Sequence, residues 1–581
     1  MSRLFTIVLV TTLSGLLLSG CGGIRKADSR AGRDDARRPE MPQLKAQQAP
    51  LPDIEFDSEL LYQLLVGEIS GQRGQLGLSV TSYLKAAEAT RDPRIAARAT
   101  RIAVFARDEQ AALAASHLWA QVAPQNLDAR QMLGTMQLRA SDIDGAVEQF
   151  STILKSPDID KDKRFLLVAG LLAREKDKQA ALTLMQRLIE PYKNDPHALY
   201  AYSYLAEQVG ELGLARASIE TLLRQDPDSE RANLQYAQIL KLQNNGNEAK
   251  AVIQKLLDKD PESMNVRLSY ARLLVQLKQV KQARKQFEIL ASQAPDNIDI
   301  LYALGMLALQ SEDLDSARKY LVQLASKGKR TLEASFYLGQ IAESQQKLDE
   351  ARGWYEAVNR GENYVAAQVR AAMIMAKLGD VQAGRNHLRS IRARSQGQQV
   401  LLFLAESDML REAKLTADAL EQLTGALKEL PGNVDLLYAR SLIAEQLDAM
   451  EIAEADLRAI LKQEPDNAHA LNALGYTLAD RTTRYKEAYG YIQRALELKP
   501  DDAAILDSMG WVLYRMGRHQ EAIKYLKQAL AKNDDGEIAA HLGEVLWVSG
   551  ETIEAQKIWN QAIKAFPDHS VLQKAIKRFK P

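Results

Sequence analysis

The apolar positions of this chain repeat with a period close to 34 residues. One alanine recurs in register thirteen times, and the steps between its occurrences run from 32 to 36 residues. The thirteen alanines are Ala146, Ala181, Ala215, Ala249, Ala283, Ala317, Ala351, Ala383, Ala419, Ala453, Ala488, Ala522 and Ala555. Self-similarity at a fixed period predicts a repeat architecture, so we expect one continuous array and not several globular domains.

Other residues keep the same register and indicate a pair of crossing helices in each unit. A large apolar residue such as Phe150 or Trp559 stands four residues after the alanine. A proline such as Pro261 often stands twelve residues after it, where it ends the second helix because proline lacks an amide donor. The first helix of six units carries a glycine, at Gly134, Gly305, Gly339, Gly475, Gly510 and Gly543. Small residues at these places let the two helices approach each other.

This period and these markers resemble the tetratricopeptide repeat family. The segment 503–514, followed by Gly517, Arg518 and Ala522, shows one unit in full. The resemblance implies an all-α, right-handed superhelical solenoid of about fifteen helical hairpins, in which each pair contacts its neighbours. We expect degenerate N-terminal repeats over 54–126, the regular repeats over 127–569, and a C-terminal capping helix over 570–581.

The first twenty residues predict a secretory signal, because a short apolar run from Leu4 to Leu18 follows Arg3. The sequence 18–21, Leu-Ser-Gly-Cys, resembles the lipobox of bacterial lipoproteins. That resemblance implies acylation of Cys21, which becomes the first residue of the mature protein and a durable membrane anchor. An uncleaved membrane anchor is the alternative. Gly22, and not aspartate, follows the cysteine, which favours the outer membrane, facing the periplasm.

Residues 21–53 join this cysteine to the repeats. They are polar, rich in Pro, Gln and Arg, and too poor in apolar residues to fold. We expect a disordered tether with a root-mean-square reach of about 30 Å. Cys21 is the only cysteine of the chain, so no intramolecular disulfide is possible.

Composition and motifs favour protein binding over catalysis. The chain has 75 basic and 75 acidic residues, and this balance argues against nucleic acid as a partner. No zinc-protease, phosphate-binding or dinucleotide motif is present, and the seven histidines lie in different repeats. The run 158–162 begins like a calcium loop, but Lys163 and Ala169 stand where glycine and glutamate are required. We therefore expect no enzyme activity, no cofactor and no metal.

The last three repeats carry the most distinctive residues at the first-helix positions that face the concave groove in this family. Trp, Tyr and Arg at such positions are typical of binding hot spots. The alternative is that Trp511 and Trp547 pack between repeats or under the terminal helix. The candidate partner-binding residues are Asn472, Tyr476, Asp480, Asp507, Trp511, Tyr514, Arg515, Glu544 and Trp547.

The lipobox, the tether and the segments 474–480 and 507–514 together resemble pseudomonad outer-membrane lipoproteins that bind a periplasmic carboxyl-terminal processing protease. The resemblance implies an adaptor that activates this serine protease and delivers peptidoglycan hydrolases to it. An assembly scaffold for exopolysaccharide or pilus export is the alternative function. A cell-wall enzyme is a third class, which the absence of a catalytic motif disfavours.

Overall fold

The structure is a computed structural model that describes residue 52 and residues 56–579. These residues form 31 α-helices and one short 3-10 turn, η1 (Glu190–Tyr192), with no strand among them. They divide into two compact units at the boundary between Tyr320 and Leu321, which falls within α17. The predicted signal peptide, Cys21 and nearly all of the tether lie outside the described residues.

The first unit contains the helices α2 to α16 and the beginning of α17. They are α2 Ser58–Gln72, α3 Leu76–Thr90, α4 Pro93–Ala106, α5 Glu109–Val122, α6 Leu127–Arg139, α7 Ile143–Lys155, α8 Arg164–Leu172, α9 Lys178–Ile189, α10 Pro196–Val209, α11 Leu212–Gln225, α12 Glu230–Leu242, α13 Gly246–Lys259, α14 Met264–Gln276, α15 Val280–Gln293, α16 Ile298–Gln310 and α17 Leu314–Ser326.

The second unit contains the remaining helices. They are α18 Thr331–Ser344, α19 Leu348–Glu356, α20 Tyr364–Lys377, α21 Val381–Ser390, α22 Gln396–Glu412, α23 Thr416–Glu429, α24 Val434–Gln446, α25 Met450–Gln463, α26 Ala468–Arg481, α27 Tyr485–Leu498, α28 Ala503–Arg515, α29 His519–Lys532, α30 Gly536–Val548, α31 Thr552–Ala565 and α32 Ser570–Phe579.

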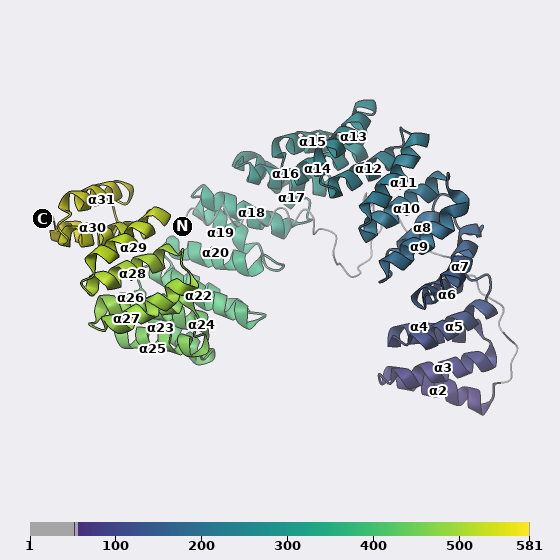
Figure 1. Cartoon of the computed structure of the whole chain (residues 1–581), viewed down its shortest axis with the longest axis horizontal. Coiled ribbons are helices and arrows are strands. Elements are labelled where there is room, and N and C mark those ends of the chain that lie inside the picture. The colour runs from purple at the N-terminus through teal and green to yellow at the C-terminus, as the bar shows by residue number, and fades with distance from the viewer. Residues whose placement is uncertain (1–51, 53–55, 580–581) are drawn as a thin grey trace. The chain divides into compact units, whose positions relative to one another are not determined.

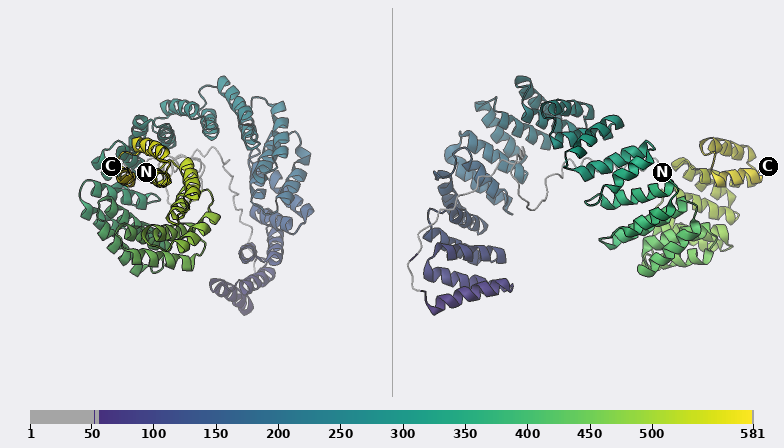
Figure 2. Two further views of the ribbon diagram at one scale, coloured as in Figure 1. Left: turned by 60° about the vertical axis from the view of Figure 1, so that its left-hand side comes forward. Right: turned by 180° about the vertical axis from the view of Figure 1, so that it is seen from behind.

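Consecutive helices pack pairwise into about fifteen hairpins, and within each unit the hairpins stack side by side in chain order (Figures 1 and 2). The predicted all-α repeat fold is confirmed. The terminal helix α32 packs on α30 and α31 and buries Leu572 completely. No described helix is long and apolar enough to span a bilayer.

Small residues occupy the helix crossings, as the period predicts. Twelve of the thirteen repeating alanines are 0% exposed. A Cβ added at Gly339 would lie 2.7 Å from the ring of Tyr355, and one added at Gly510 would lie 2.5 Å from Leu526. Real Cβ atoms do not approach other atoms so closely, so any larger residue at these glycines would push the two helices apart.

One repeat differs from the predicted register. Ala383 is only partly buried, whereas the next residue, Gly384, is buried at the crossing. A Cβ at Gly384 would lie 2.7 Å from the carbonyl oxygen of Ala372. Asp380 caps α21 by accepting a hydrogen bond from the Ala383 amide, which places the crossing four residues after the cap, as in α19 and α23 of the neighbouring hairpins. The repeating small residue of this unit is therefore Gly384, and the assignment of Ala383 was wrong.

The turn inside most hairpins uses one residue in the left-handed conformation. Gly210, Asn244, Lys278, Glu312 and Gln346 have φ of 90°, 64°, 58°, 57° and 59° and are 34 residues apart. The backbone amide of the next residue donates to a carbonyl near the end of the first helix. The turn therefore ends this helix as a glycine at a helix C-terminus usually does. Because most of these residues are not glycine, the turns left no clear signal in the sequence.

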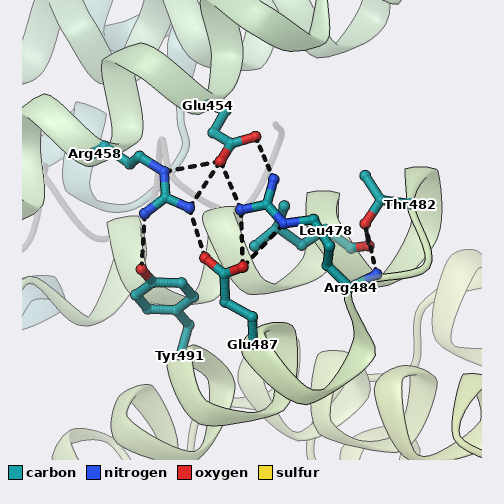
Figure 3. Close-up of polar contacts among 7 residues, drawn as sticks. All are labelled: Glu454, Arg458, Leu478, Thr482, Arg484, Glu487 and Tyr491. Atoms are coloured by element: carbon teal, nitrogen blue, oxygen red, sulfur yellow. Dashed lines mark hydrogen bonds and ion pairs between the residues drawn. The ribbon is translucent and has the colours of Figure 1, made fainter.

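Ion pairs also join successive hairpins through their second helices. Figure 3 shows one such group, the second-helix network, which consists of Glu454, Arg458, Arg484, Glu487 and Tyr491. Arg458 of α25 lies 2.6 Å from the Glu487 carboxylate of α27 and donates to the Tyr491 hydroxyl at 3.0 Å. Arg484 in turn lies 2.9 Å from Glu454. The network therefore links α25 to the start of α27.

Candidate functional site

The nine candidate residues lie on the first helices of three successive hairpins. Asn472, Tyr476 and Asp480 are four residues apart on α26 and share one face of it. The other six lie on α28 and α30, and they are Asp507, Trp511, Tyr514, Arg515, Glu544 and Trp547. The structure brings most of these side chains into contact.

Trp511 is at the centre of this group. Its ring stacks on the imidazole of His541 with a centroid separation of 4.2 Å and an interplanar angle of 26°. The indole Nε1 donates to Oδ1 of Asp480 at 3.1 Å. Trp511 is only 7% exposed, so little of its surface is available to a partner.

His541 and Asp507 form a buried pair beside this tryptophan. Nδ1 of His541 lies 2.9 Å from Oδ2 of Asp507, and their side chains are 6% and 9% exposed. Burial opposes a charge on the imidazole, but the nearby carboxylates, Asp507 foremost, together outweigh it and raise the pKa of His541 above its ordinary value. Glu537 and Glu544 act in the same direction. The imidazolium form is therefore stabilised inside the protein.

Tyr476 extends the group across three hairpins. Its hydroxyl donates to Oε1 of Glu537 at 3.3 Å, and its ring lies 6.2 Å from His541. Burial raises the pKa of Tyr476, and the carboxylates of Glu537 and Asp480 raise it further. We refer to Tyr476, Asp480, Asp507, Trp511 and His541 as the first-helix cluster.

Tyr514 and Arg515 border this cluster and retain more exposed surface, whereas Glu544 beside them is buried. The Tyr514 hydroxyl donates to Glu544 at 3.2 Å, and burial together with this carboxylate raises the pKa of Tyr514 to about 12. Arg515 donates to the Asp480 backbone carbonyl at 2.9 Å and to the Tyr485 hydroxyl at 3.1 Å. Both side chains are thus held in fixed positions at the edge of the cluster.

Trp547 and Asn472 are placed differently from the others. Trp547 stacks on Trp559 with ring centroids 5.8 Å apart, and Trp559 stacks on Phe579 of α32. It therefore belongs to the packing around the terminal helix, although it remains partly exposed. The buried Oδ1 of Asn472 has no hydrogen-bond partner among the described residues.

Sequence reasoning missed three residues of this region. No other histidine stands at metal-ligand spacing from His541, so the motif search gave it no role. It lies 34 residues from Asp507, however, which is the length of one repeat. That spacing between an acid and a histidine is the signal that could have found the pair. Glu537 and Glu445 were missed as well. Burial raises the pKa of Glu445, Arg481 opposes this, and the nearby Asp480 and Glu537 carboxylates add to it.

The arrangement supports binding more readily than chemistry. No group of His, Cys, Asp or Glu side chains among the described residues could hold a metal ion. The acids and bases of the cluster are hydrogen-bonded to one another, and no nucleophile lies beside a free base among them. A rigid stack of helical hairpins with half-exposed Tyr, Arg and Trp side chains is typical of a protein-binding surface.

The class of protein is therefore a helical-repeat binding protein. The chain belongs to the tetratricopeptide repeat family, and models of this repeat match residues 206–263, 240–307, 302–364, 466–533 and 513–578. It is 41% identical over 496 residues to the TPR repeat-containing protein PA4667 of Pseudomonas aeruginosa, covering 84% of this chain and 82% of that protein. A shorter match of 36% over 112 residues is to human protein arginine N-methyltransferase 9, of which it covers 13%.

Solved structures with similar arrangements are more distant. The Cut9–Hcn1 hetero-tetramer of the APC/C matches with 15% identity and a TM-score of 0.26, covering 84% of this chain and 97% of that one. The TPR protein TTC0263 of Thermus thermophilus matches with 23% identity and a TM-score of 0.28, covering 31% of this chain and 97% of that one.

Proposed function

We propose that this protein is a periplasmic adaptor that is held in the outer membrane by acylated Cys21. It binds a carboxyl-terminal processing protease, activates it, and delivers peptidoglycan hydrolases to it. The observation that supports this most is the combination of a lipobox with an array of repeats that belongs to a protein-binding family. An anchored adaptor needs no chemistry of its own, because holding two proteins together raises their effective concentration to roughly the millimolar range.

In this proposal the partner-binding surface is the partly exposed edge of the first-helix cluster together with Trp547 of α30. Tyr514, Arg515 and Trp547 present aromatic and guanidinium groups that other side chains already hold in place, so little conformational entropy is lost on binding. The buried Trp511 packs against Tyr514 with ring centroids 5.3 Å apart, and in this proposal it does not touch the partner.

The test is a paired capture and activity experiment. The mature chain, Tyr514→Ala with Trp547→Ala, and the control Trp354→Ala are used as baits in periplasmic extract, and captured proteins are identified by mass spectrometry. Trp354 is a matched control because it is also half-buried but lies on the second helix α19. We expect the mature chain and the control to capture a serine protease and a cell-wall hydrolase, and the double variant to lose at least one of them.

The purified protease is then assayed on the hydrolase with and without the mature chain. Faster degradation in its presence supports the adaptor role. Capture of polymer-export or pilus components with no effect on proteolysis would replace the proposal with the scaffold function. Mass spectrometry of the membrane-extracted protein tests the anchor, since an unmodified Cys21 would contradict it.

A further inference from the structure

Where one hairpin follows another, the first helix of the later hairpin packs on the earlier one through two positions that recur in each repeat. In α24 these positions are Leu436 and Ile443, which are 0% and 4% exposed and share a core with Leu423 of α23. In α14 they are Val266 and Leu273, 1% and 5% exposed. Each pair stands five residues before and two residues after the small residue of the crossing, which is Ser441 in α24 and Ala271 in α14. The pattern defines a stacking surface.

The same positions of α2 are uncovered. Its crossing residue is Gly67, so the stacking positions are Tyr62 and Ile69, which are 59% and 47% exposed. Leu61 and Leu65 lie on the same side of the helix and are 44% and 51% exposed. We call Leu61, Tyr62, Leu65 and Ile69 the open face. No described element packs on it.

Several contacts fix the rotation of α2, so the open face cannot turn inward. A Cβ at Gly67 would lie 2.8 Å from the Tyr83 ring, so this side of the helix is in close contact with α3. Ser79 donates to the Gly67 carbonyl at 2.5 Å, and the Tyr83 hydroxyl donates to Glu68 at 2.6 Å. Arg98 of α4 also lies 3.0 Å from Glu68. The open face is therefore a permanent apolar surface.

We propose that the open face lies in the lipid leaflet that anchors the chain at Cys21, so that α2 rests in the membrane surface. The inference builds on the anchor in the proposed function. Only residues 22–55 separate Cys21 from Phe56, and a flexible chain of that length would have a root-mean-square reach of about 30 Å, so the anchor would keep α2 close to the bilayer. At such effective concentrations a contact that is weak by itself becomes well populated.

The size and chemistry of the open face favour lipid over a protein occupant. Four half-exposed side chains fall well short of the roughly 800 Å² per partner that a stable protein complex buries. Inner stacking positions carry aliphatic residues such as Val266 and Leu436, whereas α2 carries the larger ring of Tyr62, which would hold a second helix away. Phe56, just before α2, is 61% exposed, and aromatic side chains prefer the membrane interface.

The chain's own upstream segment is a poor cover for this surface. Its sequence is polar and rich in Pro, Gln and Arg, so it offers few apolar side chains that could cover the open face. A planar lipid leaflet needs neither shape complementarity nor a helical partner.

The experiment tethers the full mature chain, residues 21–581, to vesicles through the Cys21 thiol and a maleimide lipid. This supplies the anchor whether or not cells acylate Cys21, so the result does not depend on the proposed function. The vesicles contain phosphatidylcholine and a brominated phosphatidylcholine that quenches tryptophan fluorescence. The probe is Tyr62→Trp, and the matched control is Ile553→Trp, because Ile553 is 86% exposed on α31.

We expect the brominated lipid to quench most of the emission that Tyr62→Trp adds to the native tryptophans, and to leave that of Ile553→Trp unchanged. High salt should not reduce the quenching, since the contact is apolar. Adding Leu65→Asp and Ile69→Asp should abolish it without lowering the melting temperature, because both side chains are exposed. Equal quenching of probe and control, or no quenching of Tyr62→Trp, overturns the inference. So does a dimer in lipid-free solution that the two aspartates dissociate, since a second copy would then cover the open face.

Discussion

Two of the places where charged side chains join successive hairpins of the C-terminal unit differ mainly in burial. In the second-helix network, the Arg458 and Glu487 side chains are 40% and 37% exposed. In the first-helix cluster, the His541 and Asp507 side chains are 6% and 9% exposed. Both link neighbouring repeats through direct ion pairs.

The difference in burial decides what each link contributes. Water competes for exposed charges and salt screens them, so breaking an exposed pair costs little. A buried group that loses its partner keeps the full cost of desolvation. The first-helix cluster should therefore determine the stability of this unit far more than the second-helix network, although the network has more ion pairs.

The largest expected effect is that of Trp511→Ala. Removing a buried indole should lower the free energy of unfolding by about 3–5 kcal/mol. It also leaves His541 without its stacked neighbour. Thermal and urea unfolding measure the change, and Tyr514→Ala, at the partly exposed edge, should cost clearly less. If Trp511→Ala left the melting temperature unchanged, the indole would not be needed for packing. It would then be free to contact a partner, as its position in the groove alone suggests.

A smaller loss is expected for Asp507→Asn. The amide keeps the shape of the carboxylate but removes its charge, so the hydrogen bond to His541 weakens by about 1–3 kcal/mol. The control is Asp466→Asn, which changes an exposed pair with Arg494. Unfolding in urea should separate the two variants. Equal effects would contradict the contrast between the buried and the exposed pairs.

The sequence predicted the fold better than the site, for a physical reason. Crossings admit only small residues, so alanine and glycine mark them every 34 residues whatever else changes. The predicted register failed only at Ala383. The crossing residue of that repeat is Gly384, and the alanine beside it fits the repeat spacing almost as well. The turns left little trace, because Asn244, Lys278 and Glu312 adopt the left-handed conformation without a glycine.

The sequence predicted which side of the first helices the candidate residues share, but not how deeply these residues are buried. Repeat positions put Tyr476, Asp480 and Trp511 on one side of successive first helices, and the structure brings them together. Position alone does not reveal that His541 stacks against Trp511 and closes it off from solvent. That depends on how far two successive helices lean together, which the residue types of a single repeat do not determine.

The pH dependence of stability tests the charge of the buried pair. The folded-state pKa of His541 is above its ordinary value, so its contribution is fully present below pH ~6.5 and is lost as the pH rises through the folded-state pKa. The free energy of unfolding should therefore fall on the alkaline side, by less than Asp507→Asn costs. Urea unfolding of the wild type and of His541→Gln over this range measures it. With rising pH, the free energy of unfolding of the wild type should fall more than that of His541→Gln. Parallel pH profiles of the two proteins would contradict this prediction.

The smallest effect is expected for Arg484→Ala in the second-helix network. Arg484 is 40% exposed and Glu454 28%, and Arg458 also pairs with Glu454 at 2.8 Å. Removing Arg484 thus leaves Glu454 with a second cation, and the loss should be about 0–1 kcal/mol and vanish in high salt. Arg440→Ala is the informative contrast, because its partner Asp456 is only 4% exposed and would be left buried. Unfolding at low and high salt measures both variants. A large, salt-resistant loss for Arg484→Ala would show that the network, although exposed, holds α25 and α27 together, and burial would then no longer explain which charges matter.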